Sequence, residues 1–328
     1  MQNSFLKKFS FLILFLSMAF LFPVNSQSQT AKSFKKLNLN IQSYPRMDGS
    51  TSVYPLNMLI ACKLLNVTYQ WTTTTVFSTE RRLYPVAADT NVPFNVYLIY
   101  RKVQATGTHT AYENLILDIS DLILEARQPS PDELELAGKY NIKLIYKPIA
   151  LDAFVFLLNK NNPVQSLTIK EIQDIYSGKI TQWDQVGGTT AKINAYQRED
   201  NSGSQELLKE LVMKDIPMPT TALTKSMILY GMTGPFNKLS QDTNGLGYSV
   251  YYYEENMAPN QDIKMCDING IMPNQQTIKS KKYPLTTEVY AVIRENLDKK
   301  SPAYQMYQWL SSKEGKEVIK ESGYVPAD

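Results

Sequence analysis

The sequence predicts an α/β protein in which strands and helices alternate along most of the chain. Residues 142–150 and 153–159 are rich in β-branched and aromatic side chains, which is typical of strands. Residues 168–179 have the pattern of a capped helix, because Thr168 is followed three positions later by Glu171. Alternation of this kind predicts mostly parallel sheets flanked by helices.

The other elements are expected in the following order. Residues 37–42 predict a first strand, and Pro55 predicts the start of a helix because its missing N–H needs no partner in the first turn. The stretch from Asn66 to Thr110 is less regular and indicates an irregular or hairpin insertion. Further along, the pattern predicts a helix at 205–213, a strand at 287–293 and a terminal helix at 302–323.

The N-terminus has the features of a secretory signal peptide, which we expect at residues 1–26. Lys7 and Lys8 precede an apolar run that ends at Val24, and the polar sequence QSQTAKS follows a cleavage site near Ser26. The run is shorter than a membrane-spanning helix requires, although retention of the segment as an anchor is the alternative. The segment predicts a periplasmic or otherwise exported protein.

Charge and composition exclude several classes of function. The chain has 34 basic and 31 acidic residues, and removal of Lys7 and Lys8 brings it close to neutrality. A nucleic-acid partner is therefore not expected, because such proteins need a basic surface. Cys62 and Cys266 are expected to be free buried thiols, with a disulfide as the alternative. His109 is the only histidine, so no histidine metal cluster is possible and no metal or cofactor is expected.

Two stretches place hydroxyl groups at the start of a helix. In DGSTSVYP (48–55), Ser50, Thr51 and Ser52 stand just before an apolar helical pattern. Ser52 can be an ordinary N-cap, or the hydroxyls can help the free N–H groups of the helix start to enclose an anion. In REDNSGS (198–204), the same arrangement recurs with a glycine that permits close approach and an arginine that can bind an oxyanion in a bidentate manner.

The order and spacing of these motifs resemble the phosphate-binding proteins of Pst-type ABC importers, within the type II periplasmic binding-protein superfamily. DGSTSVYPL looks like the first phosphate loop of that family, and 198–204 is similar to its Arg-x-x-x-Ser-Gly-Thr loop. The segments NPVQSLTIKEIQDIYSGKITQWDQVGG, GLGYSVYYY, YPLTTEVYAV and SKEGKEVIKESGYVP also fit, so the resemblance covers nearly the whole mature chain.

The resemblance implies a two-lobed fold with the ligand between the lobes. Lobe I would comprise 33–150 and 288–328, and lobe II would comprise 151–287. It also implies a monomer without cofactor that delivers phosphate, or a related oxyanion, to a membrane ABC permease or a sensor. Carried over position by position, the phosphate-binding residues would be Thr51, Ser52, Val53, Thr108, Arg127, Arg198, Ser202, Gly203 and Ser204.

The sequence departs from the family pattern at one position. Arg127 stands where many members carry an aspartate that accepts a proton from phosphate and rejects sulfate. If Arg127 points inward, the resemblance implies a site of donors only and weaker selectivity against sulfate. Asp121 is expected to be structural, because it lies at the end of an apolar strand.

Two alternatives to phosphate capture stay open. A binding protein of the same fold can be tuned to another oxyanion or to an organic acid. A serine hydrolase using Ser52 with His109 as base is the enzymatic alternative, but no serine lies in a nucleophile-elbow motif. The sequence therefore favours a binding protein over an enzyme.

Overall fold

The computed structural model describes residues 37–328 except 74, 76–79, 87–92 and 219–226. Its helices are α1 (Tyr54–Leu64), α2 (Pro93–Lys102), α3 (Thr108–Ile116), α4 (Pro131–Lys139), α5 (Ile169–Tyr176), α6 (Gly203–Leu207), α7 (Gly234–Leu239), α8 (Gln275–Lys279), α9 (Pro302–Trp309) and α10 (Lys313–Glu321). Short 3₁₀ or π segments are η1 (Thr51–Val53), η2 (Trp183–Val186), η3 (Leu208–Met213) and η6 (Tyr253–Met257).

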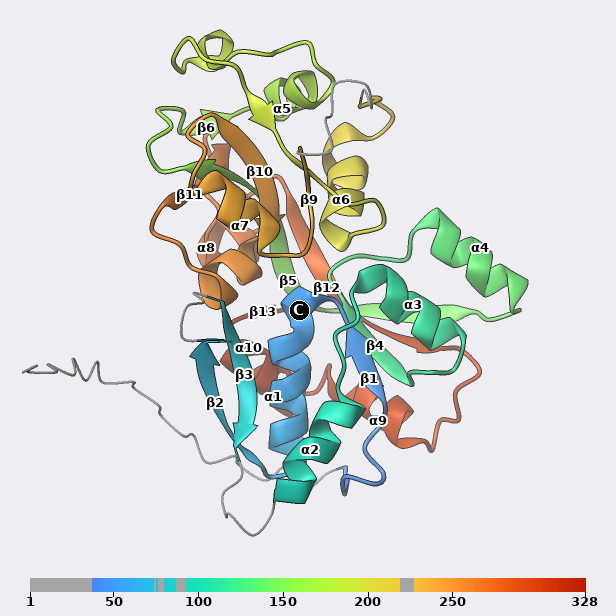
Figure 1. Ribbon diagram of the computed structural model, residues 1–328. Coiled ribbons are helices and arrows are strands. Elements are labelled where there is room, and N and C mark those ends of the chain that lie inside the picture. The colour runs from blue at the N-terminus through green and yellow to red at the C-terminus, as the bar shows by residue number, and fades with distance from the viewer. Residues whose placement is uncertain (1–36, 74, 76–79, 87–92, 219–226) are drawn as a thin grey trace, which may run out of the picture.

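The strands form one large mixed sheet and two small ones (Figure 1). They are β1 (Met47–Gly49), β2 (Thr68–Thr73), β3 (Arg81–Val86), β4 (Leu122–Glu125), β5 (Leu144–Asn159), β6 (Ser166–Leu167), β7 (Asn194–Ala195), β8 (Gln197–Arg198), β9 (Ile228–Leu229), β10 (Gly245–Val250), β11 (Ile263–Ile268), β12 (Thr286–Arg294) and β13 (Val325–Pro326). The large sheet has the order β1-β4-β12-β5-β10-β7, with β11, β13 and β6 attached beside this path.

Strand β5 joins the two halves of the large sheet. From Leu144 to Ala153 it pairs with β12, and from Phe154 to Asn159 it pairs with β10 and β11. In Figure 1, β5 and β12 pass through the middle of the molecule, with α1, α2 and α3 at one end and α5 and β6 at the other. The expected strands 142–150 and 153–159 are thus one continuous strand.

The α/β class with flanking helices agrees with the sequence prediction, but the expectation of mostly parallel pairing is wrong. Strand β5 pairs antiparallel with β10, β11, β12 and β13, and β12 pairs antiparallel with β4. Only outer pairs such as β1 with β4 and β10 with β7 are parallel. The chain crosses the middle of the molecule in both directions, and neighbouring crossing strands are therefore antiparallel.

Helices cover both faces of the sheet. Leu122 and Leu124 on β4 belong to the main core, whereas Ile123 between them packs with Ala111 and Leu115 of α3 on the opposite face. This alternation follows from the two-residue period of a strand. It places the start of α3 directly beside the end of β4, where the candidate site is found.

Two further sequence predictions need correction. Residues 37–46 contain no strand, because Asn40 and Ser43 exchange side chain–backbone hydrogen bonds that stabilise a turn, including Ser43 N–H to Asn40 Oδ1 at 2.9 Å. The terminal helix is broken into α9 and α10, since Ser312 accepts a hydrogen bond from the N–H of Gly315 and starts a new helix. Other expectations are confirmed: α5 has the capping box of Thr168, and β2 with β3 forms a hairpin.

Candidate functional site

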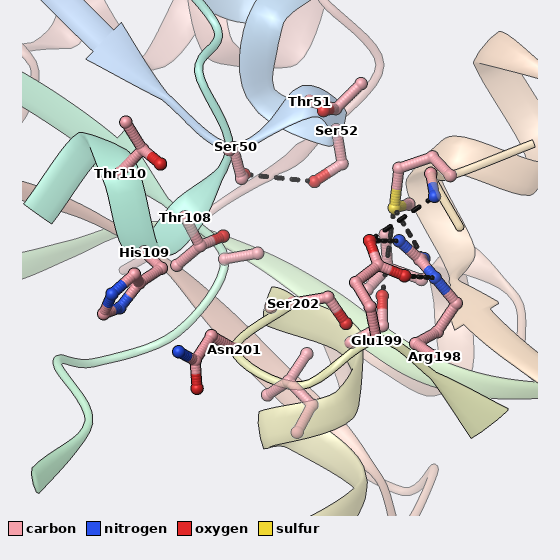
Figure 2. Close-up of a pocket in the computed structure, with 18 of the residues that line it drawn as sticks. Ser50, Thr51, Ser52, Thr108, His109, Thr110, Arg198, Glu199, Asn201 and Ser202 are labelled. Atoms are coloured by element: carbon pink, nitrogen blue, oxygen red, sulfur yellow. Dashed lines mark hydrogen bonds and ion pairs between the residues drawn. The ribbon is translucent and has the colours of Figure 1, made fainter. Parts of the chain in front are cut away.

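A cavity of about 360 Å³ lies where the first turns of three helical segments meet. Thr51 and Ser52 come from η1, Thr108 comes from α3, and Ser202–Ser204 come from the start of α6 (Figure 2). Arg198, at the end of β8, also lines this cavity. The structure therefore brings together seven of the nine residues expected from the sequence, from segments far apart in the chain.

The first turn is built so that its hydroxyls remain available. The hydroxyl oxygens of Ser50 and Ser52 lie 3.3 Å apart, and within the described residues no side chain caps η1 or α1. The interpretation of Ser52 as an ordinary N-cap is therefore wrong. Val53 is not among the residues that line the cavity, and its N–H donates to Ser50 O at 3.2 Å. Both observations favour Thr51 and Ser52 as the groups that face a ligand.

Asp48 connects the first turn to the second, a role that the sequence did not reveal. Its carboxylate is buried and accepts hydrogen bonds from the N–H of Gly49 at 2.8 Å and the N–H of Thr106 at 2.9 Å. It also accepts from the hydroxyl of Thr106 and the amide of Asn114, each at 2.8 Å. One carboxylate thus fixes the position of two loops around the cavity. The only sequence signal was its place at the start of the first motif.

The second turn starts α3 at Thr108. Gly107 precedes it with a φ of 94°, a conformation that favours glycine, and no side chain in the described part of the chain caps this helix. The N–H groups of the first turn therefore face the cavity region without a side-chain acceptor. Beneath Thr108 lies Glu125, which is fully buried and whose two carboxyl oxygens have no hydrogen-bond partner among the described residues. Burial raises the pKa of Glu125 well above its ordinary value, although the positive charge of Arg127 opposes the shift.

The third turn starts α6 and lies against the second. The hydroxyl of Ser202 accepts the N–H of Gln205 at 3.2 Å, so Ser202 is an N-cap as well as a wall residue. A Cβ atom at Gly203 would lie 2.6 Å from Thr108 Oγ1. Only a glycine allows the two helix starts to approach this closely. The glycine of the motif is thus explained by the distance between the two turns.

Arg198 is held in place by several contacts. Its side chain is 4% exposed, its Nε donates to Leu229 O at 3.1 Å, and its Nη1 lies 3.5 Å from Met232 Sδ. The Nε and Nη2 atoms each donate to the carboxylate of Glu199 at 3.0 Å (Figure 2). This bidentate pair lowers the pKa of Glu199 despite its partial burial, so Glu199 is ionised at neutral pH. The sequence did not predict that Glu199 would also line the cavity.

The cavity has little net charge to attract an anion. Arg198 is balanced by Glu199, and Asp200 also lines the wall. Attraction must therefore come mainly from oriented N–H groups at helix starts and from hydroxyls, which carry partial rather than full charges. The carboxylate of Glu199 adds one strong acceptor to this set of donors.

Arg127 does not line the cavity, which corrects the expectation of an inward-pointing second arginine. Its guanidinium forms a bidentate buried ion pair with Glu133, at 2.8 and 2.7 Å, and lies over the ring of Tyr112. Glu133 belongs to the first turn of α4, three residues after Ser130, and is fully buried. The arginine is needed there to neutralise a buried carboxylate.

His109 and Asp121 each contact groups other than Ser52. His109 lies on the cavity wall, but its Nδ1 contacts Glu133 Oε1 at 3.1 Å, and within the described residues no hydrogen bond joins it to Ser52. Asp121 accepts the backbone N–H and the guanidinium of Arg46, so its expected structural role is confirmed. The geometry that a Ser52–His109 hydrolase would need is not formed in the described structure.

The described residues contain no cluster of side chains suited to a metal ion. Cys62 and Cys266 are both buried and free, as expected, and burial raises the pKa of each thiol to about 12. None of the helices in the described part of the chain has the length and apolar character that a membrane crossing needs. The expected signal peptide, residues 1–26, lies outside the described residues.

Comparison with known proteins decides the family. A family model described as "PBP superfamily domain" matches residues 68–314. The chain belongs to this superfamily. Among curated proteins, it is 25% identical over 224 residues to the phosphate-binding protein PstS of Borreliella burgdorferi, which covers 67% of this chain and 77% of that protein. It is 27% identical to the protein SphX of Synechococcus elongatus, covering 68% of each.

Solved structures show the same fold. A protein from Clostridium perfringens, assigned to phosphate ABC transport and solved with bound phosphate, aligns with a TM-score of 0.62 at 23% identity over 86% of this chain and 98% of the other. An ABC-type phosphate transport receptor from Vibrio cholerae aligns with a TM-score of 0.57 at 21% identity, covering 85% and 98%. The large mixed sheet with flanking helices is therefore the fold of this group of binding proteins.

Proposed function

We propose that this chain is an exported solute-binding protein that captures inorganic phosphate for ABC-type uptake or sensing. The observation that carries the proposal is the convergence of three helix starts and Arg198 on one cavity. Oriented N–H groups and hydroxyls bind a tetrahedral oxyanion on several sides at once. The names of the relatives support phosphate as the ligand. Of the two carboxylates on the described cavity wall, Glu199 and Asp200, the less exposed Glu199 is the proposed acceptor for a proton of that ligand.

The proposed binding residues are Thr51, Ser52, Thr108, Arg198, Ser202, Gly203 and Ser204. These residues are proposed to bind the anion because they line the cavity. Asp48 is added as the residue that holds the first two turns together. The chain is proposed to act as a binding protein and not as an enzyme, and a membrane ABC permease is the proposed partner of a monomer.

We further propose that the site lies between two lobes, formed by 33–150 with 288–328 and by 151–287. Thr51, Ser52 and Thr108 would then belong to one lobe, and Arg198 and Ser202 to the other. Anion binding would favour the closed arrangement in which both sets of groups contact the same ligand. The close approach of Gly203 to Thr108 supports this arrangement.

Calorimetric titration of the mature protein with phosphate, sulfate and small carboxylates tests the proposed function. Phosphate is expected to bind with 1:1 stoichiometry and much more tightly than the other anions. A carboxylate as the best ligand would support the organic-acid alternative instead. Failure of every anion to bind at neutral pH would reject the proposal.

Glu199 is expected to determine the preference for phosphate over sulfate. At neutral pH phosphate keeps a proton that the ionised carboxylate can accept, whereas sulfate has none and is repelled. The change Glu199→Gln should therefore lower the ratio of phosphate to sulfate affinity by about tenfold, mainly through a gain in sulfate binding. Competition titrations of both anions measure this ratio.

Glu206→Gln is the matched control for Glu199→Gln. Glu206 lies on α6 outside the cavity and pairs with Lys209 at 2.9 Å. The control removes one nearby charge and should change the affinity for both anions equally. If the ratio of phosphate to sulfate affinity in Glu199→Gln stays within twofold of wild type, Glu199 does not determine the preference for phosphate.

Gly203→Ala is expected to weaken phosphate binding. The added methyl group would push the Thr108 hydroxyl away from its position, which costs roughly 1 kcal/mol, or about fivefold in affinity. Gly138→Ala on α4 is the control, since a Cβ there meets no atom within 4 Å. Equal affinities of the two variants in a calorimetric titration would contradict the close packing of α3 against α6.

A further inference from the structure

A second cavity, of about 790 Å³, lies away from the candidate site and shares no lining residue with it. Its walls are α8 on one side and α10 on the other, and the last residues of the sequence form its floor. We call it the lysine groove, because Lys279, Lys313, Lys316 and Lys320 all line it. None of the anion-binding residues proposed above lines this groove, so the proposed phosphate site does not account for its lysines.

The four lysines outnumber the two acidic residues of the groove, Glu317 and Asp328, and within the described structure they form no ion pair with them. Lys313, Lys316 and Lys320 follow one another at three- and four-residue spacing along α10, so they form a row on one side of that helix. Within the described residues, none of the four ammonium groups has a hydrogen bond or an ion pair, although the acidic residues Glu317 and Asp328 also line the groove. A row of like charges destabilises a helix slightly. An external anionic partner would remove this repulsion.

The floor of the groove is linked to the large sheet and to the candidate site. Val325 and Pro326 form β13, which pairs with β5. Tyr324 is 3% exposed, its ring stacks on Tyr252 with centroids 3.7 Å apart, and its hydroxyl donates to Ser52 O at 3.1 Å. Only Tyr324 would therefore separate a partner bound in the groove from the first anion-binding turn.

We propose that the lysine groove binds an extended acidic segment of a partner protein. The lysine row spans seven residues of helix, or about 10 Å, which is the length of about three residues of extended chain. Lys279 on α8 faces the groove from the other wall, so charges act on a bound segment from two sides. A concave groove of this kind admits a narrow chain, whereas a flat lipid surface would contact only its rims. The proposal is independent of the identity of the anion in the candidate site.

Fluorescence anisotropy with a labelled octaglutamate peptide and the mature protein at low salt tests the proposal. The peptide is expected to bind saturably and to be released by added salt. The triple variant Lys313→Gln, Lys316→Gln and Lys320→Gln should weaken this binding by about tenfold or more. Glu317→Gln should strengthen it, because it neutralises one of the two acidic side chains that line the groove, Glu317 and Asp328.

The matched control carries Lys139→Gln, Lys192→Gln and Lys300→Gln, three exposed lysines outside the groove. It changes the net charge by the same amount and should leave peptide binding within twofold of wild type. Equal weakening in the two triple variants would overturn the proposal, because binding would then depend on net charge alone. Absence of peptide binding would overturn it as well. Groove-dependent binding to phosphatidylglycerol vesicles without peptide binding would assign the surface to lipid and reject the peptide.

Discussion

Replacement of Arg198 by alanine is expected to weaken phosphate binding by roughly 2 to 5 kcal/mol, which is about 30-fold to several thousand-fold. Among the described residues that line the cavity, Arg198 is the only arginine or lysine. Its removal also leaves the carboxylate of Glu199 without its partner. The variant would therefore lose an attractive charge and expose a repulsive one to the incoming anion.

Calorimetric titration of Arg198→Ala with phosphate measures this loss. Arg198→Lys should bind more tightly than the alanine variant but less tightly than wild type, because lysine keeps the charge and lacks the planar fork. Arg101→Ala, an exposed arginine on α2, is the control and should bind like wild type. If Arg198→Ala binds phosphate within twofold of wild type, Arg198 is not a ligand.

The second large expected effect is a loss of stability as the pH rises, caused by the buried carboxyl group of Asp152. Asp152 is 1% exposed on β5, where one carboxyl oxygen accepts the N–H groups of Ala153 at 2.8 Å and Tyr252 at 3.0 Å. The other oxygen has no hydrogen-bond partner among the described residues. Burial raises the pKa of Asp152 from 3.8 to about 7, and the two N–H groups only partly oppose the shift.

The sign of the pH dependence follows from this raised pKa. The stabilisation due to protonated Asp152 is complete below the unfolded pKa and is lost as the pH rises through about 7. Between pH 5 and pH 8 the group should lower the free energy of unfolding by about 2 to 3 kcal/mol. Asp152→Asn cannot ionise and should lack this part of the pH dependence.

Urea unfolding of wild type and Asp152→Asn at pH 5 and pH 8 measures the difference. The asparagine variant is expected to gain stability relative to wild type as the pH rises. Asp215→Asn, at an exposed position, should show the pH dependence of wild type. Identical pH dependence in all three proteins would show that Asp152 does not titrate in this range.

The parts of the fold and site that depend on local sequence could be predicted. Pro55 and Thr168 mark helix starts through preferences that act within one turn, and both helices are present. The hydroxyls at 51–52 and 202–204 were expected to face one ligand, and the structure places them on one cavity. Their spacing around each helix start is visible without any knowledge of the tertiary structure.

The parts that depend on contacts between distant residues could not be predicted. Asp48 accepts hydrogen bonds from Thr106 and Asn114, which lie 58 and 66 positions away, and no local pattern indicates such a bond. Arg127 was expected in the site from its place in a motif, but its ion pair with Glu133 is set by the packing of α4. Strand direction was missed for the same reason, since the pairing of β5 with β12 is determined by the path of the whole chain.

A crystal structure of the mature protein grown with saturating phosphate shows whether the cavity is the phosphate site. We expect one phosphate in the cavity of Figure 2, within hydrogen-bond distance of Arg198 and of groups at all three helix starts, with one oxygen beside Glu199. A cavity without phosphate under these conditions, or a phosphate bound only in the lysine groove, would show that these residues do not form the phosphate site.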